Sequence, residues 1–540
     1  MNQSRAALLS VYDKTGIAEF AQGLADLGWT IYSSGGTAAA LRGGGVPVSD
    51  VAGLVGGGAI LGHRVVTLSR EVHAALLARP VAEDLAELDA LGIPFIDLVC
   101  VDLYPLAAEL ANPAATRESV LEKTDIGGPT MLRSAAKGRR IVIAEPAQRA
   151  EVLAWLTAGE PDPESFRTAL AARAEGIVAA YCLESARYHS QSRINGVVAA
   201  ETLAGKYGEN AWQAPAGLFS ANLAVAGPPD PLALDQFSVV AGTAPSYNNL
   251  AEVDRQLQTI THIAAGFEAN FGAVPFMAVG TKHGNPCGAA VGEDRATVIR
   301  QMVTGDARAI FGGLVMLNFP LTEALADELL SFGTGGGRRL LDGISAPAFD
   351  GAAVAMLSRK GDKCRFLANP ALEHLGRDSL DAQPRWRYVR GGFLGQPNYT
   401  YVASLTDPEL TATGTPTAAQ SRDLILAWAI GSTSNSNTVT LVKGGQLIGN
   451  GVGQQDRVGC CELAVKRARD AGHDPHGSVA YSDSFFPFPD APGVLADAGV
   501  SAIWATTGSV RDAETQALCA DRGVVLYQVP DARGRGFFGH

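Results

Sequence analysis

The N-terminal part of this 540-residue chain alternates short apolar runs with amphipathic segments, and this alternation strongly constrains the fold. Ala6–Val11 has the pattern of a buried strand, and a helical pattern runs from about Gly16 to Leu27. Trp29–Tyr32, Ile96–Val101 and Arg140–Ala144 are further strand candidates. Strands that alternate with helices predict an α/β domain built on a parallel sheet.

The pattern changes near residue 200. A long helix is predicted from about Pro163 through Tyr188, a polar segment follows at Lys206–Asn210, and Gly227–Pro231 is predicted to be a loop. We therefore place one domain at 1–199 and a second, also mixed α/β, at 200–540. Strand candidates in the second domain are Phe276–Val279, Gly313–Leu317, Val354–Leu357, Thr438–Val442, Ser478–Tyr481 and Ala502–Ala505.

Composition excludes some classes of partner. The 43 Lys and Arg against 55 Asp and Glu give a net charge of −12, which argues against bulk binding to nucleic acid or acidic membranes. Seven cysteines, two of them adjacent at Cys460 and Cys461, favour a reducing compartment. Ala6–Leu9 is too short for a secretory core, and no apolar run approaches a membrane span. We expect a cytoplasmic protein.

Two ionisable residues, Lys282 and His283, follow the apolar run Phe276–Gly280 in the second domain. The neighbouring Gly284 and Pro286 indicate a turn, and strand ends in α/β sheets commonly bind ligands. A histidine moves protons near neutral pH, and a lysine stabilises developing negative charge. An isolated Lys-His pair is more often a solvated loop, so the interpretation depends on the accompanying segments.

Four further segments have compositions suited to ligands. Ser246–Leu250 puts amides at a turn before a helix, and Ile310–Gly313 sets an aromatic ring beside a glycine backbone. Gly449–Arg457 is glycine-rich and precedes a predicted helix, as an anion cradle does. Ser482–Asp490 supplies aromatic faces and carboxylates. Each has a structural alternative, such as helix capping by Asn249 or packing of the phenylalanines in the core.

The first domain carries a matching pair of segments. Ser10–Gly16 and Ser33–Thr37 each follow a predicted strand and open a helix. Hydroxyls, backbone amides and a lysine at helix N-termini make a phosphate site, with ordinary capping as the alternative for either segment alone.

In this order, the segments resemble the bifunctional purine-biosynthesis family AICAR transformylase/IMP cyclohydrolase. The resemblance covers essentially the whole chain. Its motifs stand at Asp102–Pro105, Asp125–Gly128, Arg133–Lys137, Tyr207–Gln213, Ser246–Asn249, Lys282–Gly288, Phe311–Gly313, Ser436–Asn437, Gly449–Arg457, Ser482–Phe488 and Thr507–Asp512. The resemblance implies formyl transfer from the cosubstrate 10-formyltetrahydrofolate to AICAR, giving FAICAR, and then ring closure to IMP.

The resemblance also implies the two folds: a Rossmann-like N-terminal domain related to methylglyoxal synthase, and a zinc-free, cytidine-deaminase-like transformylase domain. A zinc deaminase needs His-x-Glu and Pro-Cys-x-x-Cys ligands. Pro286-Cys287 lacks the second cysteine and no His-x-Glu accompanies it, so we expect no zinc and a packing role for Cys287. The family implies a homodimer with shared transformylase sites, and a structural monovalent cation is a candidate. Nucleotide and folate are the expected partners, with neither nucleic acid nor membrane.

For formyl transfer, the family implies that His283 takes the proton of the AICAR amine as the formyl carbon is attacked. Lys282 would stabilise the oxyanion or protonate the folate nitrogen, and Asn437 would orient the formyl group. Asp342 is expected near the folate pterin, and Lys206 and Arg457 near the phosphate or sugar. The remaining carried-over substrate contacts are Tyr207, Asn249, Phe311, Phe485 and Asp490.

For ring closure, the resemblance implies Lys137 and Tyr104 at the formyl oxygen and Asp125 at the attacking amide. The substrate-binding residues carried over in this domain are Ser10, Lys14, Ser34, Gly36, Thr37, Arg64 and Thr67.

One family motif departs from its pattern in this domain. The active-site lysine of Gly-Arg-Val-Lys-Thr-Leu-His-Pro is Val66 here, and Ser69-Arg70 replaces the following His-Pro. Valine offers neither charge nor proton, although His63 is close in sequence. We hypothesise that the cyclohydrolase activity is reduced or redirected.

Two departures in the second domain also concern the nucleotide. The family Asn-Pro-His-Gln is Asn210–Gln213 with Trp212, and the C-terminal segment is Gly536–His540, with Arg533 or Arg535 as the candidate replacement for a family arginine. The changes keep two alternatives open: a specialised paralogue that acts on an AICAR-like carboxamide of a modified nucleoside, and a non-catalytic regulator that binds nucleotide or folate.

Overall fold

A computed structural model describes residues 5–62, 64–221 and 229–539, and the chain divides into two compact units. The N-terminal unit comprises residues 1–202 and 219–229, and the C-terminal unit comprises residues 203–218 and 230–540. The two-stranded pair of β6 (Ala200–Gly205) and β7 (Ala216–Ser220) contains two of the three points at which the chain passes between the units, and the third lies between residues 229 and 230. Part of the predicted loop at 227–231 lies outside the described residues.

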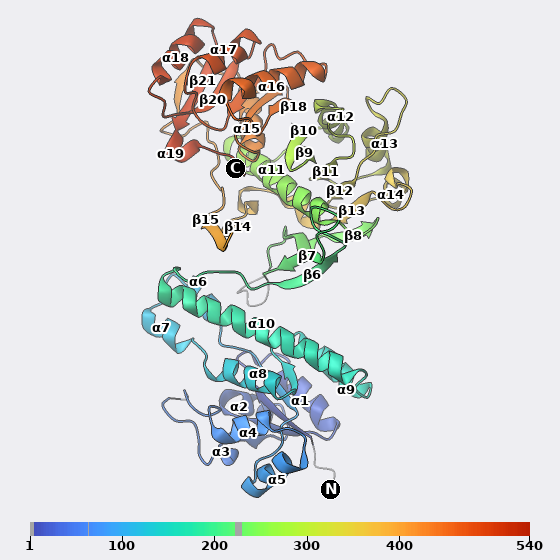
Figure 1. Ribbon diagram of the computed structural model, residues 1–540, viewed down its shortest axis with the longest axis vertical. Coiled ribbons are helices and arrows are strands. Elements are labelled where there is room, and N and C mark those ends of the chain that lie inside the picture. Colours follow the sequence, from blue (N-terminus) through green and yellow to red (C-terminus); the bar gives the residue numbers. More distant parts are fainter. Residues whose placement is uncertain (1–4, 63, 222–228, 540) are drawn as a thin grey trace. The chain divides into compact units, whose positions relative to one another are not determined.

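A five-stranded sheet of order β3-β2-β1-β4-β5 forms the centre of the N-terminal unit (Figure 1). Every neighbouring pair is parallel, which confirms the α/β class. The strands are β1 (Ala6–Ser10), β2 (Thr30–Ser33), β3 (Ser49–Asp50), β4 (Leu98–Val101) and β5 (Ile141–Ile143). The helices are α1 (Ile17–Asp26), α2 (Gly35–Gly43), α3 (Val51–Leu54), α4 (Arg70–Leu77), α5 (Ala82–Leu91), α6 (Leu106–Ala111), α7 (Arg117–Glu122), α8 (Gly127–Lys137), α9 (Gln148–Thr157) and α10 (Pro163–Ser190).

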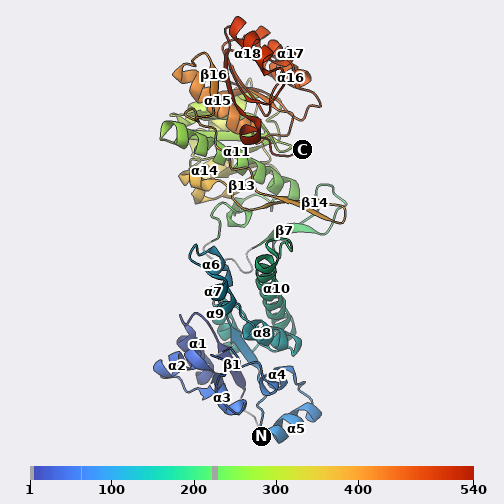
Figure 2. The same cartoon turned by 90° about the vertical axis from the view of Figure 1, so that its left-hand side faces the viewer.

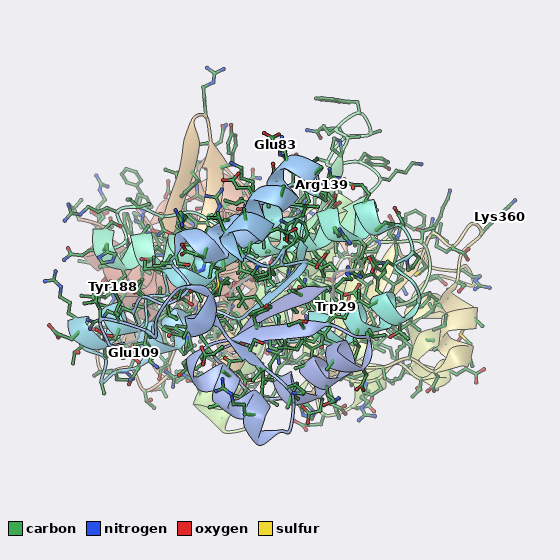
Figure 3. The ribbon with its side chains drawn as sticks, turned by 90° about the horizontal axis from the view of Figure 1, so that it is seen from below. Trp29, Glu83, Glu109, Arg139, Tyr188 and Lys360 are labelled. Atoms are coloured by element: carbon green, nitrogen blue, oxygen red, sulfur yellow. The ribbon has the colours of Figure 1, made fainter. Side chains whose placement is uncertain are left out.

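Both faces of this sheet are buried, as parallel sheets require. Leu8 of β1 belongs to the apolar cluster on one face, and Leu9, the next residue, belongs to the cluster on the other. Trp29, labelled in Figure 3, belongs to the second cluster, and the Arg5 guanidinium lies 4.1 Å from its ring centroid. The near-continuous apolar strands predicted from sequence therefore pack against helices on both faces of the sheet.

The C-terminal unit is built on a twelve-stranded mixed sheet of order β16-β21-β20-β19-β17-β18-β10-β9-β11-β12-β13-β8. Its strands are β8 (Ser238–Ala241), β9 (Phe276–Lys282), β10 (Asn285–Gly292), β11 (Leu314–Leu317), β12 (Gly343–Ala346), β13 (Arg365–Ala368), β16 (Thr411–Thr413), β17 (Val439–Lys443), β18 (Gln446–Gly451), β19 (Val479–Ser482), β20 (Ala502–Thr507) and β21 (Val525–Pro530). A separate hairpin of β14 (Arg385–Val389) and β15 (Gly392–Gln396) projects from the unit (Figure 2).

Helices flank this large sheet. The α-helices are α11 (Tyr247–Phe271), α12 (Arg295–Gly305), α13 (Glu323–Ser331), α14 (Gly351–Leu357), α15 (Ala418–Gly431), α16 (Arg457–Asp470), α17 (Asp490–Asp497), α18 (Asp512–Asp521) and α19 (Asp531–Gly534), and the short 3-10 helices are η1 (Leu234–Gln236), η2 (Pro370–His374) and η3 (Arg377–Ser379). Among the described residues, no helix has the length and apolar character needed to span a bilayer.

One predicted strand is wrong. Val354–Leu357 is the second half of helix α14, which begins at Gly351. A four-residue apolar run does not distinguish a buried strand from one side of a helix. The alanines in Gly-Ala-Ala-Val-Ala-Met-Leu have the highest helix propensity, and they decide the outcome. The other five strand candidates of this unit overlap β9, β11, β17, β19 and β20.

The register of four strands assembles one edge of the large sheet. Thr281 pairs with Leu314, Leu314 with Gly343, and Gly343 with Arg365. The residue that ends β9 and the residues that precede β11 and β12 therefore lie along the same edge, although they are far apart in sequence.

Candidate active sites

Lys282 and His283 lie at a tight hairpin turn. Lys282 ends β9 and pairs with Asn285, the first residue of β10, while His283 and Gly284 connect them with φ of 55° and 72°. Two consecutive residues with positive φ are the requirement of a type I′ turn, whose twist matches that of the flanking strands. Histidine is among the residues that tolerate this region better than most. The His283 side chain is exposed beside the half-buried Lys282.

Pro286 does not end the strand. It lies within β10, where the pairing with β9 shifts register between Pro286 and Gly288. A bulge is one of the few places in a sheet that accept proline, because its missing N–H breaks no regular ladder bond.

The Lys282 ammonium is anchored to the loop before β11. Its Nζ donates a hydrogen bond to the carbonyl oxygen of Phe311 at 2.5 Å, and a Cβ added at Gly312 would lie 3.9 Å from the same nitrogen. The N–H of Asp342 donates to the carbonyl of Gly313 at 3.0 Å. The structure thus brings Lys282, the exposed Phe311 ring and Asp342 to one edge of the sheet.

A second contact brings the loop before β17 to the hairpin turn. Asn285 Oδ1 accepts the backbone N–H of Asn435 at 3.1 Å, and its Nδ2 donates to the carbonyl of His283 at 3.2 Å. A cavity of about 220 Å³ adjoins this junction. Its lining includes Lys282, His283, Asn285, Cys287, Asp306, Asn450 and Arg467. The proposed base, the proposed oxyanion partner and the segment that carries Asn437 are therefore close neighbours.

Asn437 is held by Arg457. Arg457 Nη2 donates to Asn437 Oδ1 at 2.7 Å, and Arg457 Nη1 is ion-paired with Asp483. The side chain of Arg457 is only 10% exposed, and that of Asp483 is fully buried. Arg457 was expected at the nucleotide phosphate or sugar. In the structure its guanidinium contacts three protein partners, Asn437, Asp483 and the carbonyl of Thr438.

The aromatic segment after β19 divides between core and surface. Phe486 is buried, which confirms the structural alternative for that ring, whereas Phe488 is exposed and Phe485 is half-buried. The Arg535 guanidinium lies 5.8 Å from the Phe485 ring centroid. Asp490 begins α17 with its carboxylate accepting the N–H of the next residue at 2.8 Å, and its side chain is exposed.

Two of the four other predicted substrate contacts have local structural roles. Asp342 is ion-paired with Arg359. Asn249 forms a capping box with Ser246, the N-cap residue of α11, in which each side chain accepts the backbone N–H of the other residue. Lys206 is exposed and Tyr207 half-buried directly after β6. Within the part of the chain that the structure describes, neither forms a hydrogen bond with Lys282 or His283.

The two predicted phosphate segments of the N-terminal unit lie together. Thr37 Oγ1 exchanges hydrogen bonds with the backbone of the residue after β1, at 3.0 and 3.1 Å. A Cβ at Gly36 would lie 4.0 Å from Lys14 Nζ. Ser34 stands at the N-cap of α2 but its hydroxyl does not cap the helix, and Ser10 is half-buried at the end of β1. Burial lowers the pKa of Lys14.

Asp125 forms several hydrogen bonds at the N-terminal end of α8. Its carboxylate accepts the N–H of Gly128 at 2.8 Å and that of Tyr104 at 3.4 Å, and its own N–H donates to the Tyr181 hydroxyl at 2.7 Å. Thr67 Oγ1 lies 3.0 Å from the position of a Cβ added to the first residue of α8. Burial raises the pKa of the Asp125 carboxyl, and the N–H donors oppose this shift.

Lys137 lies at the other end of the same helix. It is the last of the 11 residues of α8 and is exposed. At 1.5 Å per residue, α8 is about 15 Å long, so the helix separates Lys137 from Asp125 and Tyr104. Both Asp125 and Lys137 line a groove of about 530 Å³ bounded by α8 and α10. The backbone positions of Asp125 and Lys137 are therefore separated by about the length of α8, although both residues border the same groove.

The segment before α4, which departs from the family motif, is held by local contacts. Ser69 caps α4, because its hydroxyl accepts the N–H of Val72 at 3.1 Å, so the residue that replaces a family histidine acts as a helix cap. Arg64 is ion-paired with Glu122 on the surface, and Val66 is half-buried. His63, the residue considered as a substitute for the missing lysine, lies outside the described residues, as does His540.

Sequence reasoning missed two residues that support these sites. Arg255, on α11, donates to the Asn435 side chain at 3.0 Å, and burial lowers its pKa to about 10. Tyr181, on α10, bridges the N–H of Asp125 and the carbonyl of Lys123 at 2.7 and 3.0 Å. Both occur inside long helices without a local motif, so only their tertiary contacts identify them.

Metal-binding clusters of three or more His, Cys, Asp or Glu side chains are absent from the described parts of the chain. Cys287 donates a hydrogen bond to the carbonyl of Gly280 at 3.5 Å, and burial raises the pKa of its thiol to about 12. The side chain is thus packed as a neutral thiol.

Comparisons with known proteins cover both units. A family model described as AICARFT/IMPCHase bienzyme matches residues 135–467, and one described as MGS-like domain matches residues 16–130. The bifunctional purine biosynthesis protein PurH of Rhodopirellula baltica is 36% identical over 542 residues, which cover 97% of each chain. The protein of the same name from Neisseria gonorrhoeae is 33% identical over 548 residues, 97% of this chain and 98% of the relative.

Among solved structures, the crystal structure of ForH is 37% identical and covers 35% of this chain and 100% of its own. Its TM-score of 0.31 is too low to support an argument about the fold.

Proposed function

The chain belongs to the AICARFT/IMPCHase bienzyme family, and on that premise we propose which of its residues carry out the two reactions. It is a bifunctional enzyme of purine biosynthesis, a formyltransferase and cyclohydrolase, and its family uses 10-formyltetrahydrofolate as cosubstrate. AICAR receives the formyl group to give FAICAR, and FAICAR closes to IMP. The individual roles below rest on the geometry of the two units.

The His283 turn is the observation that carries the formyl-transfer proposal. The AICAR amine is a weak nucleophile because its lone pair is delocalised, so a base must take its proton as the formyl carbon is attacked. His283 is exposed at the turn and suited to that task. Lys282, held by the Phe311 carbonyl, stabilises the oxyanion or protonates the leaving folate nitrogen. Asn437 orients the formyl group from the neighbouring loop.

The substrate contacts form a second part of the proposal. Phe311 and Phe485 present aromatic faces to the AICAR base, and Asp490 accepts from its carboxamide. Asp342 recognises the pterin as a hydrogen-bond acceptor, and Arg359 is ion-paired with the same carboxylate. Lys206, Tyr207 and Asn249 complete the nucleotide contacts. Arg457 acts on Asn437 more directly than on the phosphate, because its guanidinium is already paired.

A homodimer is part of the proposal. The cavity beside His283 measures about 220 Å³, which is below the range of about 300–1,000 Å³ typical of a single small-molecule site. The β14–β15 hairpin exposes Tyr388, Phe393 and Leu394, and an isolated two-stranded ribbon is only marginally stable. A second copy that covers this hairpin and completes the site accounts for both observations.

For ring closure, we assign the phosphate to the paired loops that carry Lys14 and Thr37. The other members of that site are Ser10, Ser34, Gly36, Arg64 and Thr67. Asp125 orients the attacking carboxamide nitrogen, and Tyr104 lies beside it to polarise the formyl oxygen. Lys137 shares the second task from the other end of α8, on the groove that Asp125 also lines. Val66 in place of a lysine lowers the rate of this step.

Two finer assignments complete the proposal. A structural monovalent cation suits the buried hydroxyl-rich turn of Ser432, Thr433, Ser434 and Thr438, because such ions take hydroxyl and carbonyl oxygens. A cytoplasmic location fits the free thiols of all seven cysteines.

The proposal is tested by incubating the enzyme with AICAR and 10-formyltetrahydrofolate and separating FAICAR from IMP. Accumulation of FAICAR indicates formyl transfer with an impaired cyclohydrolase, and IMP indicates that both sites work. If folded protein forms neither FAICAR nor IMP, the assignment of AICAR as substrate is refuted and another carboxamide nucleotide is favoured.

A further inference from the structure

The orientation of the Asn437 amide is determined by its neighbours. The Arg457 guanidinium has only donors, so the atom that faces its Nη2 at 2.7 Å is Oδ1. The carbonyl of Gln454 can only accept, so the atom that faces it at 2.8 Å is Nδ2. One N–H of the amide and one lone pair of its oxygen remain, and both have fixed directions.

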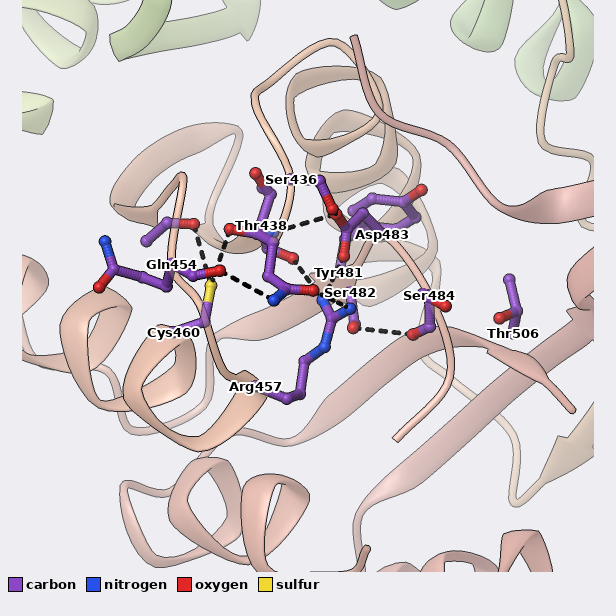
Figure 4. A network of polar contacts seen from close by, with 12 residues as sticks. Ser436, Thr438, Gln454, Arg457, Cys460, Tyr481, Ser482, Asp483, Ser484 and Thr506 are labelled. Carbon is purple, nitrogen blue, oxygen red and sulfur yellow. Dashed lines mark hydrogen bonds and ion pairs between the residues drawn. The ribbon is translucent and has the colours of Figure 1, made fainter. Parts of the chain in front are cut away.

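The two residues that flank Asn437 are held by one carboxylate (Figure 4). Asp483 Oδ2 accepts the Ser436 hydroxyl at 2.8 Å and the Thr438 N–H at 3.1 Å. Its other oxygen is ion-paired with Arg457. Asp483 therefore restrains the chain before Asn437, the chain after it, and the guanidinium that orients its side chain.

Backbone contacts hold the same residue from the opposite side. The Asn437 N–H donates to the carbonyl of Gln454 at 3.2 Å, and the Gln454 N–H returns a bond to the carbonyl of Asn437 at 3.4 Å. Cys460 Sγ also donates to that carbonyl at 3.2 Å. Burial raises the pKa of Cys460 to about 12, so the thiol keeps the proton that it donates.

Asp483 holds these groups from the protein interior. Its side chain is fully buried, and that of Arg457 is 10% exposed. A buried pair persists when both charges are also hydrogen-bonded, and removal of one partner strands the other charge in the interior. Loss of Asp483 would therefore release both flanks of Asn437 and leave Arg457 unpaired.

We propose that Asp483 is a positioning residue for formyl transfer, which acts through Arg457, Ser436 and Thr438 to fix the direction of the remaining Asn437 N–H. This inference rests on the proposed role of Asn437 in orienting the formyl group. As the AICAR nitrogen bonds to the formyl carbon, its proton passes to His283. When the bond from that carbon to the folate nitrogen breaks, that nitrogen keeps the electron pair and takes a proton from Lys282. Asp483 itself exchanges no proton, and the oriented Asn437 N–H holds the formyl oxygen throughout.

The first test is a double-mutant cycle of Asp483→Asn and Asn437→Ala, measured as kcat and KM for formyl transfer. Misplacement of an orienting group by about 1 Å costs about 10²-fold, so Asp483→Asn should lower kcat by about that factor and change either KM much less. In the Asn437→Ala background, Asp483→Asn should cause little further loss. Losses that multiply in the double variant would show a merely structural Asp483 and overturn the proposal.

Arg457→Lys provides a second test, because it keeps the charge that Asp483 needs. A lysine ammonium lacks the planar fork that reaches two acceptors in fixed directions, so kcat should again fall while the fold is retained. Wild-type kcat in a folded Arg457→Lys enzyme would overturn the proposal. The matched control is Asp423→Asn, which alters another buried carboxylate, one that accepts the N–H groups of Gly444 and Gly445 at 2.7 Å. It should lower stability without lowering kcat.

The outcomes separate this inference from the role on which it rests. Unchanged formyl transfer in Asn437→Ala refutes the proposed role of Asn437 and, with it, any positioning through that residue. A large loss in Asn437→Ala together with normal rates in Asp483→Asn and Arg457→Lys refutes the positioning role of Asp483 alone.

Discussion

Lys282 and Phe311 are joined by a hydrogen bond of 2.5 Å from the ammonium to the backbone carbonyl. The two residues belong to neighbouring strand ends, since β9 pairs with β11. The bond ties the charged end of a flexible side chain to a fixed point of the sheet edge. Lys282 is thereby directed before substrate arrives, which reduces the entropy lost on reaching the transition state.

Removal of this charge should affect the chemical step most strongly. Lys282→Met is expected to lower kcat for formyl transfer by about 10²–10³-fold, as loss of an oxyanion partner does. Steady-state kinetics with both substrates measure the effect. The control is Lys443→Met, because the Lys443 ammonium also donates only to backbone carbonyls, at 2.7 and 3.1 Å. Equal losses in the two variants would contradict a special role for Lys282.

His283 can be replaced without disturbing its turn. Asparagine accepts positive φ well, so His283→Asn should keep the hairpin while removing the proposed base. The expected loss in kcat is about 10²–10⁴-fold. The exposed His374 provides the matched variant, His374→Asn, which should retain the wild-type rate. A folded His283→Asn enzyme with normal formyl transfer would exclude His283 as the base.

Restoring a lysine at position 66 tests the cyclohydrolase hypothesis. Val66→Lys should raise the rate of ring closure of synthetic FAICAR by about tenfold or more, because a positioned cation stabilises the developing charge. Val66→Met adds a long side chain without charge and should leave the rate unchanged. A wild-type rate already normal for the family, or an equal gain in both variants, would contradict the hypothesis.

Tyr181 is expected to support Asp125 through its hydroxyl alone. Tyr181→Phe removes the oxygen that accepts the Asp125 N–H and donates to the Lys123 carbonyl. Loss of such bonds should destabilise the N-terminal unit by about 1–3 kcal/mol and slow ring closure. Urea unfolding and the FAICAR assay measure the two effects, with formyl transfer as the internal reference. Unchanged ring closure would show that Asp125 does not depend on this bridge.

His262 should make stability depend on pH. Burial lowers its pKa from 6.5 to about 4 in the folded protein. The unfolded chain therefore binds a proton at higher pH than the folded chain, and this contribution to stability falls as pH drops from 6.5 towards 4, by roughly 3 kcal/mol in total.

His262→Phe keeps a ring to pack against Tyr399 and Trp428 while removing the titration. Unfolding of the C-terminal unit at pH 7.5 and pH 5 should show a smaller pH effect in this variant than in the wild type. The same difference in both proteins would assign the pH dependence to other groups.

The parallel sheet of the N-terminal unit was predictable from sequence because its strands are short, continuous apolar runs buried on both faces. The same rule failed at Val354–Leu357, where the run is too short to distinguish a strand from a helix. The placement of Lys14 and Thr37 was also predictable, because each lies where a strand is followed by a helix N-terminus.

Other features depended on contacts between distant segments. Arg457 carries an anion-site pattern in sequence, yet in the fold its guanidinium pairs with Asp483 and Asn437. Lys137 belongs to a motif close to Asp125 in sequence, yet the rigid length of α8 holds the two apart. Local pattern identifies the residue types that a reaction needs, but it does not state which partners they meet.

By itself, the sequence determined the α/β class, the family and the residues eligible for catalysis, because apolar periodicity and ordered motifs are properties of the chain alone. The tertiary structure decided that Lys282 is anchored at Phe311, that Arg457 contacts both Asp483 and Asn437, and that Lys137 stands a helix length from Asp125. These relationships follow from strand register, from helix rigidity and from the cost of burying a charge without a partner. All three act between residues that are tens to hundreds of positions apart in sequence.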